Sequence, residues 1–250
     1  MKQDLTGQVA LVTGSAHRVG KAIALELARA GCNVMVHYSS TNDEIARETQ
    51  REIKSLGVDA GLCKADLGSP AGVQTLIDAV QEQFGQLHIL VNSASNFQKR
   101  TIMEVTLEEW EETMRINLTA PFLLTQASVK LMLKNDPPGG VIINILDKGA
   151  TDAWVDFAHH GISKAGLYAL TRVTAAGLGP EIRCNGIIPG GVLKPNEFDN
   201  ERWLALSKEN TAMQRPGTAE DVARAAVYLA SEDWLTGVVI RVDGGESVIK

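Results

Sequence analysis

Three side chains that can exchange protons lie close together in the second half of the chain. Asp147 follows an apolar run, and His160 and Lys164 come shortly after it. A histidine has an unperturbed pKa of about 6.5 and donates a proton when it is charged. A nearby lysine would lower that pKa and a nearby aspartate would raise it. The grouping predicts acid–base chemistry. Alternatively, His160 would form a solvated pair with His159, and Asp147 would be a turn residue before Lys148.

The stretch TGSAHRVG (13–20) has the composition of a phosphate-binding turn. It follows an apolar run and leads into a segment of helical spacing, and Gly14 begins a tight turn through which a helix N-terminus can meet a pyrophosphate. Arg18 occupies a position where such turns usually have glycine. We predict that Arg18 extends sideways and holds a phosphate. A plain structural turn is the alternative.

The end of the second apolar run indicates which dinucleotide the turn would bind. NAD-specific sites usually place Asp or Glu there to bind the ribose 2′-hydroxyl. Here the run ends in HYSS (37–40), and the first acidic residue, Asp43, lies beyond it. The hydroxyls of Ser39 and Ser40 can donate hydrogen bonds to a 2′-phosphate. The pattern predicts NADP(H) rather than NAD(H).

The neighbouring turn supports the same cofactor. Arg18 and His17 would add positive charge beside the two serines. The alternative is that the serines cap the following helix, a role that Thr41 or Asn42 would also fill.

Short apolar runs rich in valine and isoleucine alternate with segments of helical spacing. The runs lack polar alternation, so we expect parallel strands covered on both faces. The expected strands are 8–13, 33–38, 59–63, 88–92, 140–146, 182–188 and 237–242. The expected helices are 18–30, 42–56, 70–84, 107–133, 161–178 and 219–230. We therefore predict one α/β domain over residues 1–250, a doubly wound Rossmann-type fold with a seven-stranded parallel sheet and helices on both faces.

Composition argues against several kinds of partner. A net charge of −6 disfavours nucleic acid, because phosphate binding needs clustered lysine and arginine. No apolar run approaches the length of a membrane span, and the first residues lack the pattern of a signal peptide. Cys32, Cys63 and Cys184 fit neither a disulfide framework nor a metal spacing. We expect a cytoplasmic protein without a metal.

Further motifs follow the glycine-rich turn in a defined order. They are AD (65–66), NSAS (92–95), RINLTAPF (115–122), SKAGL (163–167), IIPGG (187–191) and VDGG (242–245). This order runs nearly end to end and resembles the short-chain dehydrogenase/reductase family. The resemblance implies oxidoreduction with a nicotinamide dinucleotide. It also implies that Lys164 binds the nicotinamide ribose and that Asn117 holds a water linked to this lysine.

Finer features resemble the pteridine reductases of that family. Those enzymes carry arginine in the glycine-rich turn, as at Arg18, and a pterin-stacking phenylalanine after the fourth strand, as at Phe97. They carry aspartate where most relatives have the catalytic serine, as at Asp147. The YxxxK signature of the family, whose tyrosine donates the proton, reads here with His160 in place of the tyrosine. The resemblance thus implies a reductase with unusual acid chemistry.

By this resemblance the candidate site residues form three groups. The catalytic group is Asn117, Asp147, His160 and Lys164. The cofactor-binding group is Gly14, His17, Arg18, Val19, Gly20, Tyr38, Ser39, Ser40, Asp66, Leu67, Asn92, Ser93, Ala94, Lys164, Pro189 and Gly190. The substrate group is Ser95, Phe97 and Trp154, and the segment 193–210 falls where relatives carry a mobile lid. Asp66 would alternatively organise the turn before Ser69, and Asn92 would brace the centre of the sheet.

Three functions remain open on the sequence alone. The first is an NADPH-dependent reductase of a pterin-like or small carbonyl or imine substrate, with protons supplied through Asp147 and His160. The second is a catalytically lapsed NADP(H)-binding sensor or partner subunit. The third is a reductase of 3-oxoacyl compounds or other ketones. The resemblance also implies a homotetramer in which helices 107–133 and 161–178 pack against symmetry mates.

Overall fold

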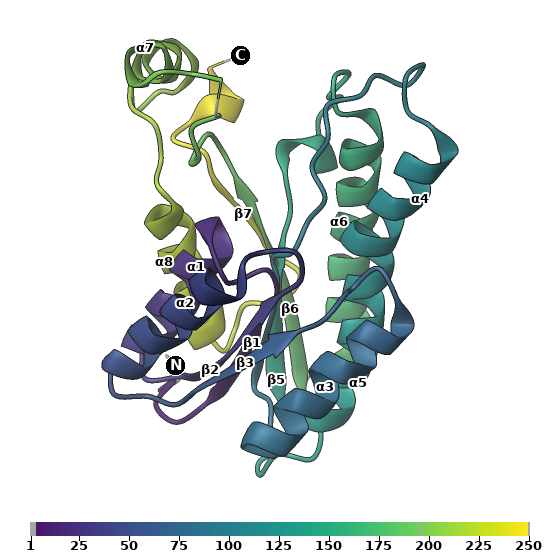
Figure 1. Cartoon of the computed structure of the whole chain (residues 1–250), viewed down its shortest axis with the longest axis vertical. Helices are drawn as coiled ribbons and strands as arrows, with labels where there is room; N and C mark the ends of the chain where they lie inside the picture. The colour runs from purple at the N-terminus through teal and green to yellow at the C-terminus, as the bar shows by residue number, and fades with distance from the viewer. Residues whose placement is uncertain (1–3, 196, 250) are drawn as a thin grey trace.

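The central feature of the molecule is a parallel β-sheet, seen in a computed structural model that describes residues 4–195 and 197–249. Within these residues, seven strands lie in the order β3-β2-β1-β4-β5-β6-β7 (Figure 1). Every neighbouring pair is parallel. The strand order therefore reverses between β1 and β4, as it does in doubly wound sheets. The predicted Rossmann-type fold is confirmed.

The strands follow the apolar runs of the sequence. Their bounds are β1 Val9–Val12, β2 Asn33–Tyr38, β3 Ala60–Lys64, β4 Ile89–Asn92, β5 Gly140–Ile145, β6 Ile182–Pro189 and β7 Val239–Val242. Every residue of β1 and β4 is buried, because helices cover both faces of the sheet centre. This two-sided burial is why these strands carry no polar alternation.

Five of the described helices, α2, α3, α4, α7 and α8, begin at a residue whose side chain caps them. Their bounds are α1 Arg18–Arg29, α2 Asp43–Ser55, α3 Pro70–Phe84, α4 Leu107–Met114, α5 Ala120–Met132, α6 Ala158–Leu178, α7 Asn200–Asn210 and α8 Ala219–Ser231. Ser69 caps α3 by accepting the Gly72 N–H, Pro70 occupies its first turn, and Gly85 ends it in the left-handed conformation. These residues give α3 the start and stop signals that isolated sequence patterns predict.

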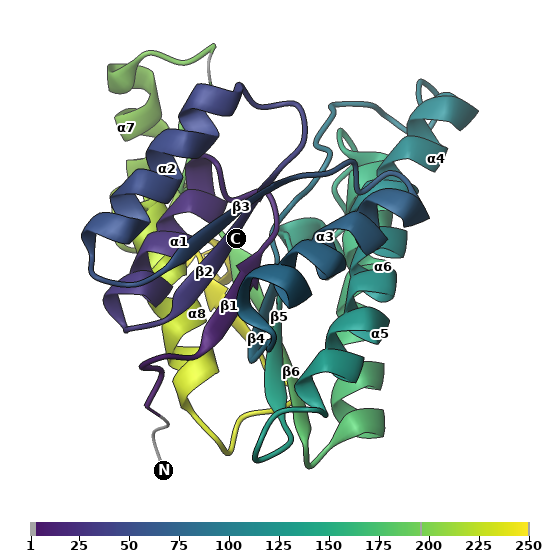
Figure 2. The same ribbon diagram turned by 60° about the horizontal axis from the view of Figure 1, so that its bottom comes forward.

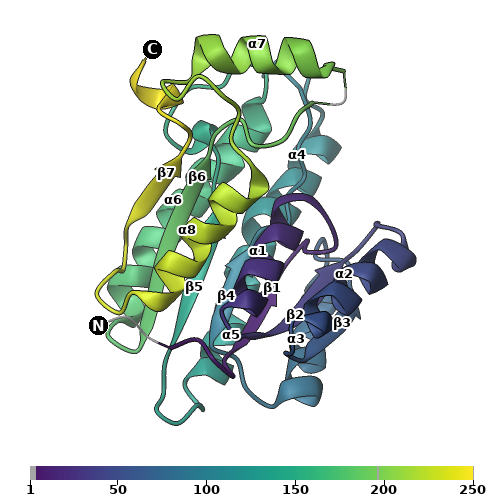
Figure 3. The ribbon, with the colours of Figure 1, turned by 90° about the vertical axis from the view of Figure 1, so that its left-hand side faces the viewer.

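Two layers of helices enclose the sheet. Helices α1, α2 and α8 cover one face, and α3, α5 and α6 cover the other (Figures 2 and 3). One apolar core lies on each side. The first joins residues such as Ile23, Leu27 and Leu229 to the sheet, and the second joins residues such as Leu76 and Leu124 to it.

The structure corrects two of the expected helices and adds one within the predicted lid segment. The predicted helix 107–133 is divided by a π-helical turn, Arg115–Thr119, between α4 and α5. Helix α6 begins at residue 158 rather than 161, so His159 and His160 lie in its first turn and both are buried. The alternative of a solvated histidine pair is therefore wrong. The predicted lid segment contains α7, and its residue 196 lies outside the described residues.

Candidate active site

The outgoing ends of the central strands gather the predicted chemistry at one edge of the sheet. β1 leads into the glycine-rich turn, β4 into the loop 93–97, β5 into Asp147, and β6 into Gly190. The reversal of strand order between β1 and β4 is the place where doubly wound folds bind ligands. The predicted cofactor and catalytic groups therefore belong to neighbouring strand ends.

The turn after β1 has a backbone that requires glycine at two positions. Gly14 has a left-handed φ of 65°, and a Cβ on Gly20 would lie 2.3 Å from the Gly14 carbonyl oxygen. Arg18 also has a left-handed φ, of 57°, and its side chain is exposed. Arg18 therefore adopts a conformation that costs a non-glycine residue about 1–2 kcal/mol.

The N-terminus of α1 has no side-chain cap. Its N-cap residue, His17, accepts no hydrogen bond from the first turn, which also contains no acidic residue. Helices α2, α3, α4 and α8 each begin with a side chain that accepts a main-chain N–H. The first N–H groups of α1 and the positive end of its dipole therefore remain free to bind an anion.

The charge at this turn comes from Arg18. Partial burial, followed in importance by the Arg18 guanidinium, lowers the pKa of His17 below its ordinary value. His17 is therefore mainly neutral at pH 7 and adds a hydrogen-bonding ring rather than a charge.

The end of β2 presents hydroxyls rather than an acid. Ser39 and Ser40 are exposed, and Asn42 caps α2 by accepting a first-turn N–H at 2.8 Å. The alternative in which the serines cap this helix is therefore wrong. The carboxylate of Asp43 pairs with the Lys64 ammonium at 2.9 Å. Lys64 thus offsets the negative charge of Asp43, the first acidic residue after this strand.

Side-chain hydrogen bonds tie β1, β4 and β5 together below the site. Thr13 Oγ1 accepts the N–H groups of Ser93 and Ala94 at 2.9 and 3.0 Å. Asn92 donates through Nδ2 to Asn144 Oδ1 at 2.8 Å. The expected bracing of the sheet centre by Asn92 is confirmed, and these contacts hold the loop after β4 beside the glycine-rich turn.

The residues after β3 are placed by local contacts. Asp66 Oδ1 accepts the Gly68 N–H at 2.9 Å, so it organises the turn before Ser69 as the alternative interpretation expected. Leu67 is buried beneath this turn, and Tyr38 is buried at the neighbouring end of β2. Asp66 itself is exposed at the same edge as the serines.

Close backbone packing places the end of β6. Pro189 is the last residue of β6, and a Cβ on the following Gly190 would lie 2.6 Å from Cα of Asp243. Glycine is therefore required where the IIPGG and VDGG motifs meet. Val19, in the first turn of α1, is half-buried and packs against the core on that face of the sheet.

Asp147, His160 and Lys164 come together at the end of β5. His160 Nε2 lies 3.6 Å from Asp147 Oδ2, which is long for a direct hydrogen bond but close enough for electrostatic coupling. Lys164 donates to the Ile145 carbonyl at 2.8 Å. Burial lowers the pKa of Lys164 to about 8, while the Asp147 charge acts in the opposite direction. His160 and Lys164 are buried, but 25% of the Asp147 side chain is exposed.

The partners of His160 determine which ring nitrogen carries a hydrogen. Nδ1 lies 3.0 Å from the Asn96 carbonyl oxygen, which only accepts, so Nδ1 is the protonated nitrogen of the neutral ring. Asn117 Nδ2 lies 3.4 Å from Nδ1, but it donates to the Asn96 carbonyl and to Ser163 Oγ, each at 3.0 Å. Nε2 has no hydrogen-bond partner among the described residues. A second proton on His160 therefore binds at Nε2, the nitrogen beside Asp147.

Asn117 lies in the π-helical turn and holds the loop after β4. Its Oδ1 accepts the Asn96 N–H at 2.7 Å and the Ser95 hydroxyl at 3.2 Å. π-Helical turns insert one extra residue into a helix and often occur at functional sites. The extra residue here directs a buried amide toward His160 and the loop that contacts it.

Aromatic rings surround His160. Phe97 stacks on Phe157 with ring centroids 4.5 Å apart, and it meets the His160 ring edge-on at 4.8 Å. Trp154 packs on Phe157 at 4.3 Å and has the Lys148 ammonium 4.4 Å from its own ring. Phe97 is 52% exposed, so part of its ring is open to a ligand. The predicted substrate residues Phe97 and Trp154 thus lie next to the acid–base group.

Comparisons with known proteins decide the family. Residues 14–247 match the family model described as "Enoyl-(Acyl carrier protein) reductase". A "Short-chain type dehydrogenase/reductase" of Picea abies is 33% identical, covering 97% of this chain and 93% of that protein. The chain belongs to the short-chain dehydrogenase/reductase family.

Two reductases of known structure resemble this chain over nearly the whole length of both proteins. The promiscuous reductase LugOII, which catalyses keto-reduction at C1 during lugdunomycin biosynthesis, has a TM-score of 0.89 and 34% identity, covering 98% of this chain and 99% of its own. The landomycin C-6 ketoreductase LanV, with bound NADP and rabelomycin, has a TM-score of 0.86 and 32% identity, covering 97% of each chain. The chain is therefore an oxidoreductase of this family.

Several residues of this family member contribute to the site although the sequence did not single them out. Asn96 and Ser163 contact Asn117, and His37 contacts the glycine-rich turn. Asn96 acts mainly through its main chain, which no residue type reveals. His37 is the first residue of the HYSS stretch (37–40), from which the choice of cofactor was predicted. Its position in the sequence therefore indicated that it lies near the cofactor site.

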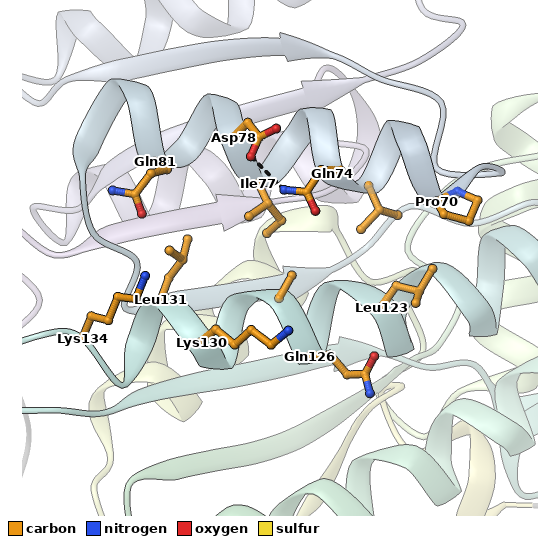
Figure 4. A pocket seen from close by; sticks show the side chains of 12 residues that line it. Pro70, Gln74, Ile77, Asp78, Gln81, Leu123, Gln126, Lys130, Leu131 and Lys134 are labelled. Atoms are coloured by element: carbon orange, nitrogen blue, oxygen red, sulfur yellow. Dashed lines mark hydrogen bonds between the residues drawn. The ribbon is translucent and has the colours of Figure 1, made fainter.

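A surface groove between α3 and α5 lies away from this chemistry. It has a volume of about 420 Å³ and runs between α3 and α5, with Ile77 and Leu131 on opposite sides, Lys130 on α5 and Lys134 just beyond its end (Figure 4). None of the described residues that line it belongs to the predicted site. The candidate site at the strand ends, where the acid–base and aromatic residues meet, is therefore separate from this groove.

Residues 4–195 and 197–249 contain neither a membrane-spanning helix nor a metal-binding cluster. No helix there combines the length and the apolar character that crossing a membrane requires. No group of three His, Cys, Asp or Glu side chains there is arranged to hold a metal ion.

Proposed function

We propose that this short-chain dehydrogenase/reductase is an NADPH-dependent reductase of a pterin-like or small carbonyl or imine substrate. The observation that supports it most is the position of the Asp147–His160 pair next to the exposed ring of Phe97. A flat substrate stacked on Phe97 would lie beside groups that can deliver a proton. Aromatic stacking favours a conjugated ring such as a pterin.

The turn after β1 fits the phosphates of a dinucleotide. The uncapped N–H groups of α1 suit a pyrophosphate, and the space that a Cβ on Gly20 would need is filled by the turn itself. Arg18 and the exposed hydroxyls of Ser39 and Ser40 would bind the 2′-phosphate. When bound, NADPH supplies a hydride to a C=O or C=N carbon.

The proton would come from His160 through Nε2. Nδ1–H is held by the Asn96 carbonyl, so exchange takes place at the other nitrogen. Asp147 is partly exposed and lies 3.6 Å from Nε2, so it would take protons from water and return them to His160, or donate directly. Lys164 keeps a buried positive charge near the pair and, as the family resemblance implies, would bind the nicotinamide ribose.

A ketone reductase without preference for pterins is the second candidate. The neighbours LugOII and LanV are described as catalysts of keto-reduction, which favours a carbonyl substrate. Both candidates use the same pair of residues, so the choice of substrate separates them.

The test is to incubate the protein and NADPH with pterins, dihydrofolate, aromatic ketones and 3-oxoacyl compounds, one at a time. Turnover of each compound is measured as the loss of NADPH absorbance. We expect turnover of at least one pterin. His160→Gln should lower kcat about 100-fold while the Kd of NADPH changes little, since proton delivery contributes on this scale. His159→Gln is the matched control, because His159 is buried in the same helical turn but has no hydrogen bond to a described residue. It should retain activity.

Two outcomes would redirect the proposal. Turnover of ketones alone would select the second candidate. If NADPH binds, no compound is reduced, and His160→Tyr creates activity, the protein is a lapsed reductase that serves as a sensor or partner subunit. Rescue by tyrosine is informative because it restores YxxxK beside Lys164 and Asn117.

A further inference from the structure

The buried imidazole of His37 links three strand ends. His37 lies near the end of β2, and its Nδ1 is 3.0 Å from the Gly14 nitrogen, which donates to it. Its Nε2 is 3.0 Å from the Ala65 carbonyl oxygen at the end of β3. The ring therefore connects the first residue of the glycine-rich turn to the segment that precedes Asp66.

The main chain of His37 holds the same turn from a second direction. Its carbonyl accepts the Ser15 N–H at 2.9 Å, and its N–H donates to Ser15 Oγ at 3.1 Å. Ser15 Oγ donates in turn to the Val12 carbonyl at 2.6 Å. Gly14 and Ser15 are thus fixed by one residue through both its ring and its backbone.

These contacts allow a single form of the ring. Nδ1 accepts the Gly14 N–H and so carries no hydrogen, which leaves Nε2–H to donate to the Ala65 carbonyl. Burial lowers the pKa of His37 to about 4, so the ring is neutral at physiological pH. Only the neutral Nε2–H form satisfies both partners.

The turn that His37 contacts has an unfavourable backbone. Gly14 adopts its left-handed φ without strain, but Arg18 does not, and a strained residue of this kind persists only where neighbouring contacts overdetermine it. We propose that His37 is a positioning residue for dinucleotide binding, holding the Gly14 peptide so that the first N–H groups of α1 face the cofactor phosphates. The proposal rests on the proposed function, because it assumes that this turn binds a dinucleotide.

Two amide substitutions separate the contacts of the ring. The Oδ1 of asparagine can replace Nδ1 as the acceptor for Gly14, whereas the Nε2 of glutamine can replace the donor to Ala65. We expect His37→Gln to raise the Kd of NADPH about 10-fold and His37→Asn to stay within about threefold of the parent, on the scale of one hydrogen bond. His37→Leu, which removes both contacts, should resemble the glutamine variant or bind more weakly.

Binding of NADPH to the full-length chain, measured by quenching of tryptophan fluorescence, gives the Kd, and thermal melting reports folding. At saturating NADPH, kcat should remain within about twofold in all three variants, because the acid–base group is unchanged. If the leucine variant does not fold, the difference in Kd between the asparagine and glutamine variants still tests the positioning role of His37. Equal Kd values in these two variants, or a loss of kcat without a change in Kd, would refute the positioning role alone. A parent that binds neither NADPH nor NADH would refute the proposed function as well.

Discussion

At the scale of single residues, Arg18 combines a conformational cost with a possible gain in binding. Its φ of 57° suits glycine, yet the residue carries an exposed cation at the N-terminus of an uncapped helix. No contact among the described residues offsets the strain through the guanidinium. A residue retained in such a conformation is more easily explained by a ligand than by stability.

Two substitutions at Arg18 separate the strain from the charge. We expect NADPH to bind the parent more tightly than NADH by about 2 kcal/mol, the scale of one or two charge-assisted hydrogen bonds. Arg18→Ala and Arg18→Gly should both lose most of this preference. The free energy of unfolding of Arg18→Gly should also be about 1 kcal/mol higher than that of Arg18→Ala, because only glycine adopts the left-handed φ without strain. Calorimetric titration and urea unfolding measure the two effects. Equal affinities of the parent for NADPH and NADH would refute the role of the 2′-phosphate.

The lowered pKa of Lys164 predicts that the stability of the fold depends on pH. Its pKa is about 8 in the folded chain against an ordinary value of 10.5, because burial disfavours the charged form. The folded chain favours the neutral amine of Lys164. The stability that this preference contributes is therefore fully present above pH 10.5 and is lost as the pH falls through 8. A shift of this size corresponds to about 3 kcal/mol.

Lys164→Met removes this titration. Relative to the parent, the variant should gain about 3 kcal/mol of unfolding free energy as the pH is lowered from 10.5 to 7. Urea unfolding at several pH values, with the exposed Lys208→Met as control, measures the difference. A difference that does not vary with pH would show that the folded chain does not depress the pKa of Lys164.

At the scale of elements, α8 is held by a residue from the sheet. Arg183 of β6 is buried, and its guanidinium donates to the carbonyls of Leu229 and Ala230 in the last turn of α8, at 2.8 and 2.7 Å. It also donates to the Leu235 carbonyl at 3.2 Å. Burial lowers the pKa of Arg183, and the carbonyl ends of α8 provide the negative pole that holds its charge.

Arg183→Met should therefore lower the free energy of unfolding by about 3 kcal/mol, because it leaves buried carbonyls without a donor. Arg224→Met is the matched control, since Arg224 is exposed on α8 and pairs with Asp221 at the surface. It should cost less than about 1 kcal/mol. Urea unfolding compares the two variants, and equal losses would contradict the capping role of Arg183.

At the scale of the whole molecule, α5 and α6 expose apolar side chains in matching rows. Ile162 and Val173 are 11 residues apart on α6, close to three helical turns, so they share one face. Phe122 and Leu133 have the same spacing at α5 and are exposed as well. Paired rows of this kind suit packing against the same helices of a second subunit.

The family resemblance implies a homotetramer, and we expect these helices to form one of its interfaces. Val173→Lys should shift the assembly to smaller species at micromolar concentration, because Val173 is 70% exposed and would be buried between subunits. Ile45→Lys on α2 is the matched control, since Ile45 is 45% exposed on another face. Light scattering coupled to gel filtration measures the mass. A monomeric parent would refute the expectation.

The sequence alone determined the topology and most element positions. The seven apolar runs became seven parallel strands, because strands buried on both faces must be apolar throughout. Local chemistry also set several helix starts, as Ser69 shows at α3. The order of motifs was sufficient to indicate the family, and the AD, NSAS, IIPGG and VDGG motifs each lie at a particular strand end.

The tertiary structure decided which of these residues act together. The sequence left open whether the serines after β2 cap a helix, and Asn42 proved to be the cap. It did not show that His37 joins Gly14 to Ala65, or that Asn96 sets the tautomer of His160 through a carbonyl oxygen. Hydrogen bonds between main-chain groups and side chains far apart in sequence depend on how the strands align. Residue types and spacing along a single chain do not encode that alignment directly.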